Sequence, residues 1–106
     1  LLREDGFIYD DGVIARLAPD RFHVTTTTGG AARVLAMMED YRQTEWPELA
    51  VWLTSTTEQW AVIALQGPDA RRVLQALAPA MDLSPAALPH MAVAHGRVAG
   101  IAAMVF

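Results

Sequence analysis

Residues 5–17 read DGFIYDDGVIARL, and this stretch decides the class of fold. It holds two Asp-Gly pairs, Asp5-Gly6 and Asp11-Gly12, each between short apolar runs that favour strands. Asp-Gly in such a setting is a strong signal for a hairpin turn, because both residues tolerate positive φ. A turn at Pro19-Asp20 and a β-branched run at 21–27 extend the pattern. The stretch therefore predicts a strand meander.

The rest of the chain alternates between helical and extended patterns. Apolar residues recur at helical spacing over 31–45, and the predicted helix ends before Trp46-Pro47. A second helix is predicted to start at 66–69, with Pro68 in its first turn, and to run to about Leu77. Strands are predicted at 49–55, 59–65, 90–94 and 97–106, the last two forming a hairpin turned at His95-Gly96. The predicted class is α+β: a mostly antiparallel sheet with two helices, in which the β-meander is followed by a split β-α-β-β-α-β (ferredoxin-like) unit.

The composition fits one small globular domain. The chain has 106 residues, of which 53% are hydrophobic, and a formal net charge of −4. Every basic residue is arginine and cysteine is absent, which excludes lysine Schiff bases, thiol nucleophiles and disulfides. Scattered arginines on an acidic chain do not favour nucleic acid, and no apolar run approaches the roughly 20 residues of a membrane span. Because the first residues do not resemble a signal peptide, we expect a cytoplasmic location.

The two ends suggest a piece of a longer protein. Residue 1 is leucine, and residues 98–106 read VAGIAAMVF, an apolar stretch without a closing turn. We therefore expect residues 1–106 to be a single domain that is a fragment of a longer chain. Apolar surface that neighbouring segments would normally cover would let such a fragment self-associate.

Few residues carry candidate chemistry. Neither serine lies in a nucleophile motif, and His90 and His95 have no third ligand nearby, so no metal site is predicted. The Asp10-Asp11-Gly12 motif suits a hairpin turn. The alternative is that repulsion between the two carboxylates and burial against the strand leave one of them as a proton acceptor. The run of threonines at 25–28 suits a strand, but its hydroxyls would equally line a polar ligand pocket. The residues alone favour the structural interpretation of both motifs.

Several segments, taken together, resemble a known family. Residues 5–12 (DGFIYDDG), the strand into Thr25–Thr28 and residues 61–68 (AVIALQGP) resemble, in order and spacing, the folate-binding domain of aminomethyltransferases, which include the T-protein of the glycine cleavage system. Within that superfamily, the chain is most similar to the alpha subunits of heterotetrameric sarcosine oxidases at residues 2–7, 25–28, 46–49 and 57–61.

The resemblance implies one-carbon chemistry. In such enzymes sarcosine is oxidised at a flavin, and tetrahydrofolate captures the imine as 5,10-methylene-tetrahydrofolate, with glycine and hydrogen peroxide as the other products. FAD or FMN, and NAD, are then expected elsewhere in the longer protein, with beta, gamma and delta subunits as partners. Asp11 matches the family's catalytic aspartate at the folate, where it would hold or accept a proton. Thr25 and Thr26 match positions that contact folate.

The chain also departs from the family pattern. It lacks the tyrosine- and glycine-rich segment and the aromatic and glutamate residues that hold the pterin in the family. We therefore expect residues 1–106 alone to have neither oxidase nor transferase activity and to bind folate weakly or not at all. Two alternatives stay open: a fragment of a T-protein, whose partner would be a lipoyl carrier, and a non-catalytic assembly module of the same fold.

Overall fold

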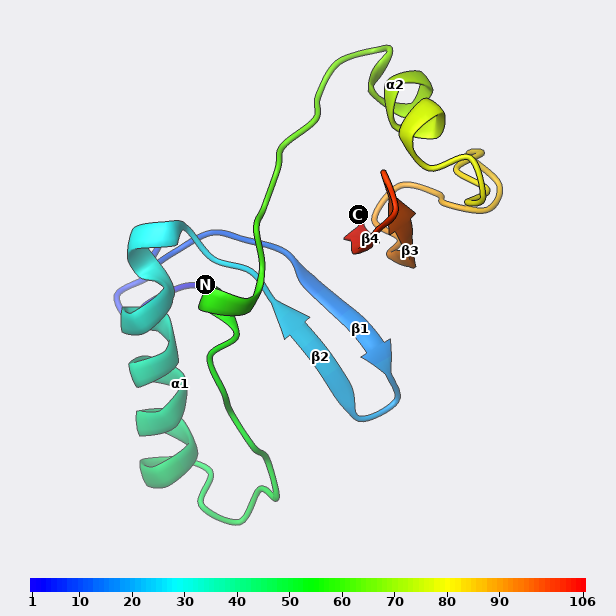
Figure 1. Ribbon diagram of the computed structural model, residues 1–106. Helices are drawn as coiled ribbons and strands as arrows, with labels where there is room; N and C mark the ends of the chain where they lie inside the picture. Colours follow the sequence, from blue (N-terminus) through cyan, green and yellow to red (C-terminus); the bar gives the residue numbers. More distant parts are fainter. The chain divides into compact units, whose positions relative to one another are not determined.

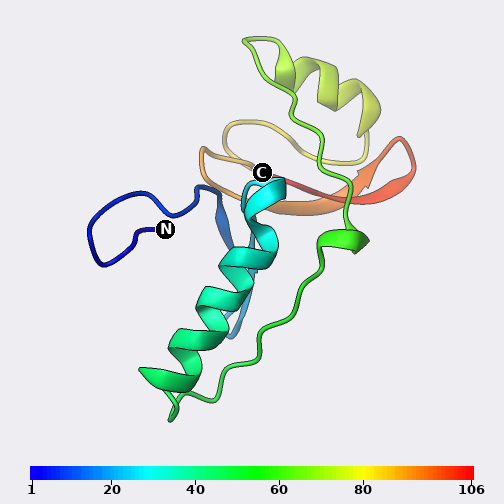
Figure 2. The ribbon, with the colours of Figure 1, turned by 90° about the vertical axis from the view of Figure 1, so that its left-hand side faces the viewer.

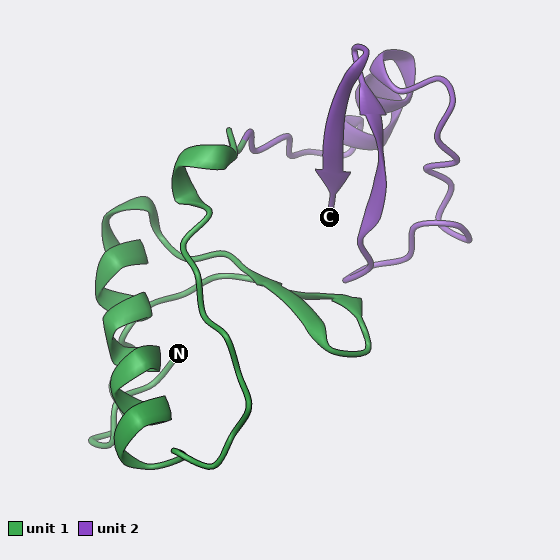
Figure 3. Ribbon diagram, turned by 60° about the horizontal axis from the view of Figure 1, so that its bottom comes forward, with its two compact units in different colours: residues 1–62 green, residues 63–106 purple.

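The computed structural model describes all residues from 1 to 106, which form two compact units (Figure 3). Unit 1 comprises Leu1–Val62 and unit 2 comprises Ile63–Phe106. The chain contains two α-helices and two small antiparallel sheets of two strands each, in the order β1-β2-α1-α2-β3-β4 with two short 3-10 helices between them. The predicted α+β class, with antiparallel pairing and two helices, is therefore confirmed. The expectation of a single domain stays a prediction.

The first two strands of unit 1, β1 (Ile14–Ala18) and β2 (Arg21–Val24), form a hairpin that Figure 1 shows leading towards α1. The strands are antiparallel, with Ile14 opposite Val24, and the ladder shifts register next to the turn. This confirms the turn predicted at Pro19-Asp20. Beyond β2 the chain passes through a 3-10 turn, η1 (Thr28–Gly30), directly into α1.

Helix α1 spans Ala31–Thr44 and confirms the helix predicted over 31–45. Val34 is its buried anchor, with 2% of its surface exposed. The helix ends where predicted: the backbone N–H of Glu45 donates to the Tyr41 carbonyl, and Pro47 follows two residues later. A proline disfavours the helical conformation of the residue before it, so the helix stops short of Trp46.

The two Asp-Gly pairs behave differently. The first forms the predicted turn, because Gly6 has a φ of 82° and its N–H donates to the Arg3 carbonyl. The hairpin turn predicted at Asp11-Gly12 is wrong. Gly12 has no positive φ, and the stretch that contains it runs beside the threonines after β2, with the Thr25 N–H donating to the Val13 carbonyl.

The strands predicted at 49–55 and 59–65 are also wrong. Figure 2 shows both stretches as coil on either side of a short 3-10 helix, η2 (Thr57–Gln59). Their apolar side chains are solvent-facing: Trp52 is 97% exposed and Ile63 is 88% exposed. A strand needs a partner for its backbone ladder, and strand propensity mostly reflects packing against such neighbours. Neither stretch has a partner strand within the chain, so the split β-α-β-β-α-β order is not formed.

In unit 2, helix α2 (Ala70–Leu77) lies near a hairpin of β3 (Ala94–Val98) and β4 (Ile101–Val105). The helix ends where predicted but begins just after the predicted start at 66–69. Its buried residues are Ala78, Leu83 and Leu88. The side chains packed against them come from α2, the following loop and the hairpin: Leu74, Met81, Ala92, Ala94, Val98 and Val105. The N–H of Ala99 donates to the Leu77 carbonyl and so ties the hairpin tip to the end of the helix.

The closing hairpin turns at a different place from the predicted one. Ala99 and Gly100 both have positive φ, at 49° and 80°, as a two-residue turn of type I′ requires. The predicted turn at His95-Gly96 is wrong, because both residues lie inside β3. Gly96 packs against the side chain of Met81, which would have to move to make room for a Cβ at this position.

Neither helix combines the length and the apolar content that crossing a membrane would require.

Candidate functional site

Asp10 is the only buried charged residue of the chain, with 5% of its surface exposed. Four donors surround its carboxylate. Oδ1 accepts the backbone N–H of Asp11 at 2.9 Å and that of Thr27 at 2.8 Å. Oδ2 accepts the Thr27 hydroxyl at 3.0 Å and the Arg33 guanidinium at 3.2 Å. Asp10 therefore joins the aspartate pair, the threonine run and α1 within unit 1.

Two glycines make room for this arrangement. A Cβ on Gly30 would lie 1.7 Å from Oδ2 of Asp10, so only glycine lets the start of α1 approach the buried carboxylate. A Cβ on Gly12 would lie 1.9 Å from the carbonyl oxygen of Thr25. Real Cβ atoms do not approach backbone oxygens so closely, so Gly12 is required for contact between two chain segments rather than for a turn.

Arg33 completes the network from the first turn of α1. Its Nη2 donates to the Tyr9 carbonyl at 2.6 Å as well as to Asp10, and its guanidinium lies 4.5 Å from the centroid of the Tyr9 ring. The Tyr9 hydroxyl donates in turn to the Arg33 carbonyl at 3.4 Å. The planar guanidinium donates to two acceptors while its face lies over the aromatic ring; the compact ammonium of a lysine has no such face.

These donors keep Asp10 ionised. The backbone N–H of Thr27 is the largest cause that holds the pKa of Asp10 below its ordinary value of 3.8, and the Thr27 hydroxyl, the Asp11 N–H and Arg33 act in the same direction. Burial opposes them, because desolvation disfavours the charged form, but it does not reverse the direction. With all of its acceptor positions engaged, Asp10 is a structural anion rather than a proton acceptor for a ligand.

A lowered pKa makes Asp10 a source of acid sensitivity. Because the folded-state pKa lies below the unfolded one, ionised Asp10 stabilises unit 1 at pH values above the unfolded pKa, and the stabilisation is lost as pH falls through the folded pKa. We expect the unfolding free energy of unit 1 to fall more steeply below about pH 4 in the native chain than in Asp10→Asn. Denaturant unfolding of both proteins between about pH 2 and 6 measures this.

Asp20→Asn is the matched control, because Asp20 is exposed in the β1–β2 turn and its side chain makes no hydrogen bond. The pKa of Asp82 is also lowered, by hydrogen bonds from the backbone N–H and then the hydroxyl of Ser84, so unit 2 keeps its own acid response in all variants. Equal slopes for the native chain and Asp10→Asn would contradict the expectation.

Asp11, the predicted catalytic residue, is exposed. Its Oδ1 accepts the Gly12 N–H at 2.8 Å, and Oδ2 makes no hydrogen bond within the chain. Asp10 Oδ1 accepts the backbone N–H of Asp11, and the Gly12 N–H holds one oxygen of the Asp11 side chain. The arrangement presents one tethered carboxylate that remains open to a ligand.

Thr25 and Thr26, which are predicted to bind folate, are half-buried and lie beside the segment that contains Asp11. The Thr25 hydroxyl accepts the Val13 N–H at 2.8 Å and donates to the Val13 carbonyl at 3.1 Å, so it extends the pairing of the two segments. The Thr26 hydroxyl donates to the Thr27 carbonyl at 2.9 Å. Both hydroxyls are therefore already used within the chain, although each oxygen keeps acceptor capacity.

Sequence reasoning missed Asp10, Thr27, Gly30 and Arg33. One signal was available: in an extended stretch, neighbouring side chains point to opposite faces, so two adjacent aspartates have different environments. One of them had to be buried and paired, and the other exposed. Which one took each role depended on the distant threonines and on α1.

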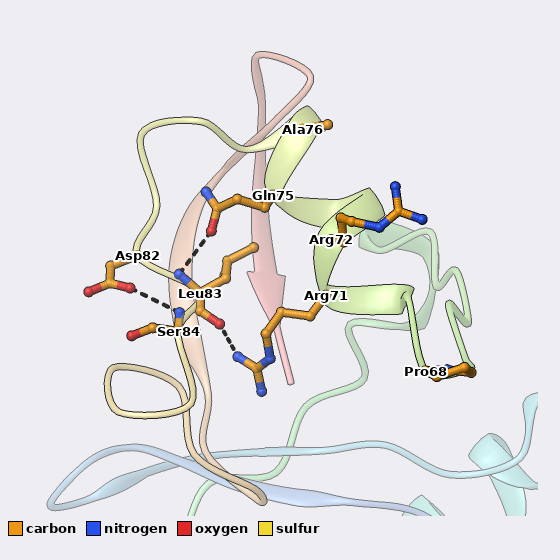
Figure 4. Close-up of a pocket in the computed structure, with 8 residues that line it drawn as sticks. All are labelled: Pro68, Arg71, Arg72, Gln75, Ala76, Asp82, Leu83 and Ser84. Carbon is orange, nitrogen blue, oxygen red and sulfur yellow. Dashed lines mark hydrogen bonds between the residues drawn. The ribbon is translucent and has the colours of Figure 1, made fainter.

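Two shallow depressions lie elsewhere on the units. One, in unit 1, lies between the N-terminal loop and α1, where the Tyr41 hydroxyl donates to Glu4 at 3.3 Å and the negative charge of Glu4 is the main cause that raises the pKa of Tyr41. The other, in unit 2, is shown in Figure 4. There Arg71 donates to the Leu83 and Leu88 carbonyls, and Gln75 donates to two further carbonyls and accepts the Leu83 N–H. These polar groups hold the loop in place, and the chain contains no cluster of three or more metal-type ligands.

Comparison with known proteins places the chain in a family. The GCVT N-terminal domain family matches residues 1–106. The sarcosine oxidase alpha subunit of Corynebacterium sp. (strain U-96) is 53% identical over 87% of this chain and 10% of its own length, and that of Rhizobium meliloti (strain 1021) is 51% identical over 87% and 9%. A probable aminomethyltransferase of Haloarcula marismortui is 35% identical over 96% of this chain and 28% of its own. The chain thus spans about a tenth of the sarcosine oxidase subunits that it matches. It belongs to the GCVT N-terminal domain family.

Proposed function

We propose that residues 1–106 form part of the tetrahydrofolate-binding domain of a sarcosine oxidase alpha subunit. In this role they help to capture the imine from sarcosine oxidation as 5,10-methylene-tetrahydrofolate, with glycine and hydrogen peroxide as the other products. The observation that carries the proposal is the exposed carboxylate of Asp11. Its Oδ1 accepts the Gly12 N–H, and the backbone N–H of Asp11 is held by the buried, ionised Asp10. The identity of 53% and 51% to two such subunits supports the same conclusion.

The residues present fit one end of a folate. Tetrahydrofolate, when bound, supplies the nucleophilic nitrogens that take up a one-carbon unit. Such an amine requires a nearby acceptor for its proton, and Asp11 Oδ2 is an acceptor that nothing within the chain occupies. Thr25 and Thr26 retain acceptor capacity on their hydroxyl oxygens beside the same segment. The chain holds no aromatic cradle for the pterin next to Asp11, since the Tyr9 ring is covered by Arg33.

Asp11 has two tasks in the proposed reaction. It accepts the proton that the attacking amine releases, and its negative charge stabilises the positive charge of the one-carbon electrophile. Thr25 and Thr26 orient the ligand along the threonine run. Asp10 takes no proton, because all four of its donors favour the ionised form.

The wider protein is proposed on the same grounds. Flavin, as FAD or FMN, and NAD would bind outside these residues, and beta, gamma and delta subunits would complete the enzyme. The pterin-holding residues would also come from outside the chain, so the isolated chain would be inactive.

The test compares the complete enzyme with the isolated chain. With sarcosine and tetrahydrofolate, the complete enzyme is expected to form 5,10-methylene-tetrahydrofolate, whereas without tetrahydrofolate the carbon leaves as formaldehyde when water attacks the imine. Titration of the isolated chain with tetrahydrofolate is expected to show no binding at micromolar concentrations. Formaldehyde as the product under both conditions would contradict the function. Micromolar binding by the isolated chain would contradict the proposed incomplete pocket.

A T-protein function is the second candidate. The 35% identity to a probable aminomethyltransferase extends over 96% of this chain, a larger share than either sarcosine oxidase subunit covers. The two candidates differ in the source of the carbon. Methylene transfer from an aminomethylated lipoyl carrier, with no turnover of sarcosine, would favour the T-protein.

A further inference from the structure

We propose that Arg33, acting through the buried Asp10, is a positioning residue for Asp11, an inference that rests on the proposed function of Asp11. Arg33 lies on α1, more than twenty residues along the chain from the aspartate pair, and touches Asp11 nowhere. It holds the two residues that precede Asp11, by donating to the Tyr9 carbonyl at 2.6 Å and to Asp10 Oδ2 at 3.2 Å. Its effect on the reaction would therefore be transmitted through the backbone.

The transmission has few steps. Arg33 and the Thr27 hydroxyl fix Oδ2 of Asp10, and this sets the rotation of the carboxylate. The other oxygen, Oδ1, then holds the backbone N–H of Asp11 at 2.9 Å. Because the Asp11 carboxylate accepts only the Gly12 N–H within the chain, no other contact fixes where Asp11 points. Loss of the two Arg33 bonds would shift the Asp10 carboxylate and the Asp11 N–H that it holds. The rest of the segment stays in place, because the N-terminal amine donates to the Asp10 carbonyl at 3.0 Å and Gly12 packs against Thr25.

The electrostatics make Arg33 hard to replace. It is the only cation that contacts the buried carboxylate, whose side chain is 1% exposed, and a buried charge that loses its partner is strongly unfavourable. Its own side chain is 56% exposed, so a change at Arg33 removes little packing. The consequence is a local change in the segment that holds Asp11 rather than loss of the fold. Arg33→Lys would keep the charge but lose the planar guanidinium that lies over the Tyr9 ring.

The experiment uses the complete enzyme with sarcosine and saturating tetrahydrofolate. The measured quantity is the ratio of 5,10-methylene-tetrahydrofolate formed to formaldehyde released. Arg33→Met is expected to lower this ratio by about 10- to 100-fold, because small misplacement of a reacting group costs about that much. The tetrahydrofolate concentration for half-maximal capture is expected to change by no more than about twofold, since Arg33 does not touch the ligand. Arg21→Met is the matched control: Arg21 is an exposed arginine of unit 1 whose side chain makes no hydrogen bond or ion pair, and this variant should keep the native ratio.

A double variant separates positioning from general damage. If Arg33 works through Asp11, Arg33→Met combined with Asp11→Asn captures no less carbon than Asp11→Asn alone. The inference would be overturned if the double variant had a lower capture ratio than Asp11→Asn, by the factor that Arg33→Met alone shows. A native ratio in Arg33→Met would overturn it as well. If Asp11→Asn alone keeps the native ratio, the proposed function of Asp11 fails first, and the inference fails with it.

A second variant covers the case in which Arg33→Met does not fold. Thr27→Val removes only the hydroxyl bond to Asp10 Oδ2, and Thr27→Ser restores it. We expect Thr27→Val to lower the capture ratio and Thr27→Ser to return it to within about twofold of native. Equal ratios in the two variants would overturn the inference.

Discussion

Replacement of Asp11 by asparagine is expected to lower capture of the one-carbon unit by tetrahydrofolate by about 10²- to 10⁴-fold in the complete enzyme. Asparagine has nearly the same shape, and its amide oxygen still accepts the Gly12 N–H that Asp11 Oδ1 accepts at 2.8 Å. It does not act as a base and brings no negative charge to a cationic electrophile. The loss therefore reports proton transfer and electrostatic stabilisation rather than altered structure. The measurement is again the ratio of 5,10-methylene-tetrahydrofolate formed to formaldehyde released.

Asp20→Asn is the matched control for this substitution as well. Asp20 is an exposed aspartate of the same unit, in the β1–β2 turn and outside the network around Asp10. The Asp20→Asn variant is expected to keep the native ratio of 5,10-methylene-tetrahydrofolate to formaldehyde. A native ratio in Asp11→Asn would remove Asp11 from the reaction and favour the non-catalytic assembly module.

Substitution of Gly12 by alanine is expected to destabilise unit 1 by about 3 kcal/mol or more, at the upper end of overpacking effects. The added Cβ would meet the Thr25 carbonyl oxygen at 1.9 Å and the Thr25 carbonyl carbon at 2.6 Å. These are backbone atoms, so no side-chain rotation relieves the contact. The two segments would have to separate, and the Val13–Thr25 hydrogen bonds would be lost with them. Denaturant unfolding of unit 1 gives the loss of stability directly.

Two further variants decide why this position is glycine. Gly29→Ala is the control, because a Cβ there meets nothing within 4 Å, and it should be neutral or slightly stabilising. Gly12→Asn distinguishes the close contact with Thr25 from the alternative explanation, a hairpin turn at Asp11-Gly12. Asparagine is well tolerated at positive φ in a hairpin turn, whereas the close contact with Thr25 excludes it as firmly as alanine. A stable Gly12→Asn chain would show that Gly12 lies in a turn.

The features of this chain that depend on nearby residues could be predicted from its sequence. The helix over Ala31–Thr44 follows from apolar spacing and from the proline that ends it. The β1–β2 hairpin follows from β-branched residues around Pro19-Asp20. The motifs at 5–12, 25–28 and 61–68 were enough to identify the family, and that family matches the whole chain. Each of these features depends on residues that are close together in sequence.

Features that depend on contacts between residues far apart in the chain could not be predicted from the sequence. Residues 49–55 and 59–65 have the composition of strands. A strand needs a partner strand for its backbone hydrogen bonds, and residues 1–106 provide none for either stretch. Asp-Gly at 11–12 has the composition of a turn, but Thr25 lies against Gly12 and the stretch continues past it. Composition gives a propensity, whereas a partner segment decides whether it is realised.

The sequence by itself, through its resemblance to a family, predicts that an aspartate of the adjacent pair and the threonine run belong to the functional region. Only the tertiary structure decided that Asp10 is the buried anion and Asp11 the exposed one. The physical reason is that a carboxylate is stable inside a protein only where enough donors surround it. Those donors come from Thr27 and from Arg33 on α1, which only folding brings to Asp10.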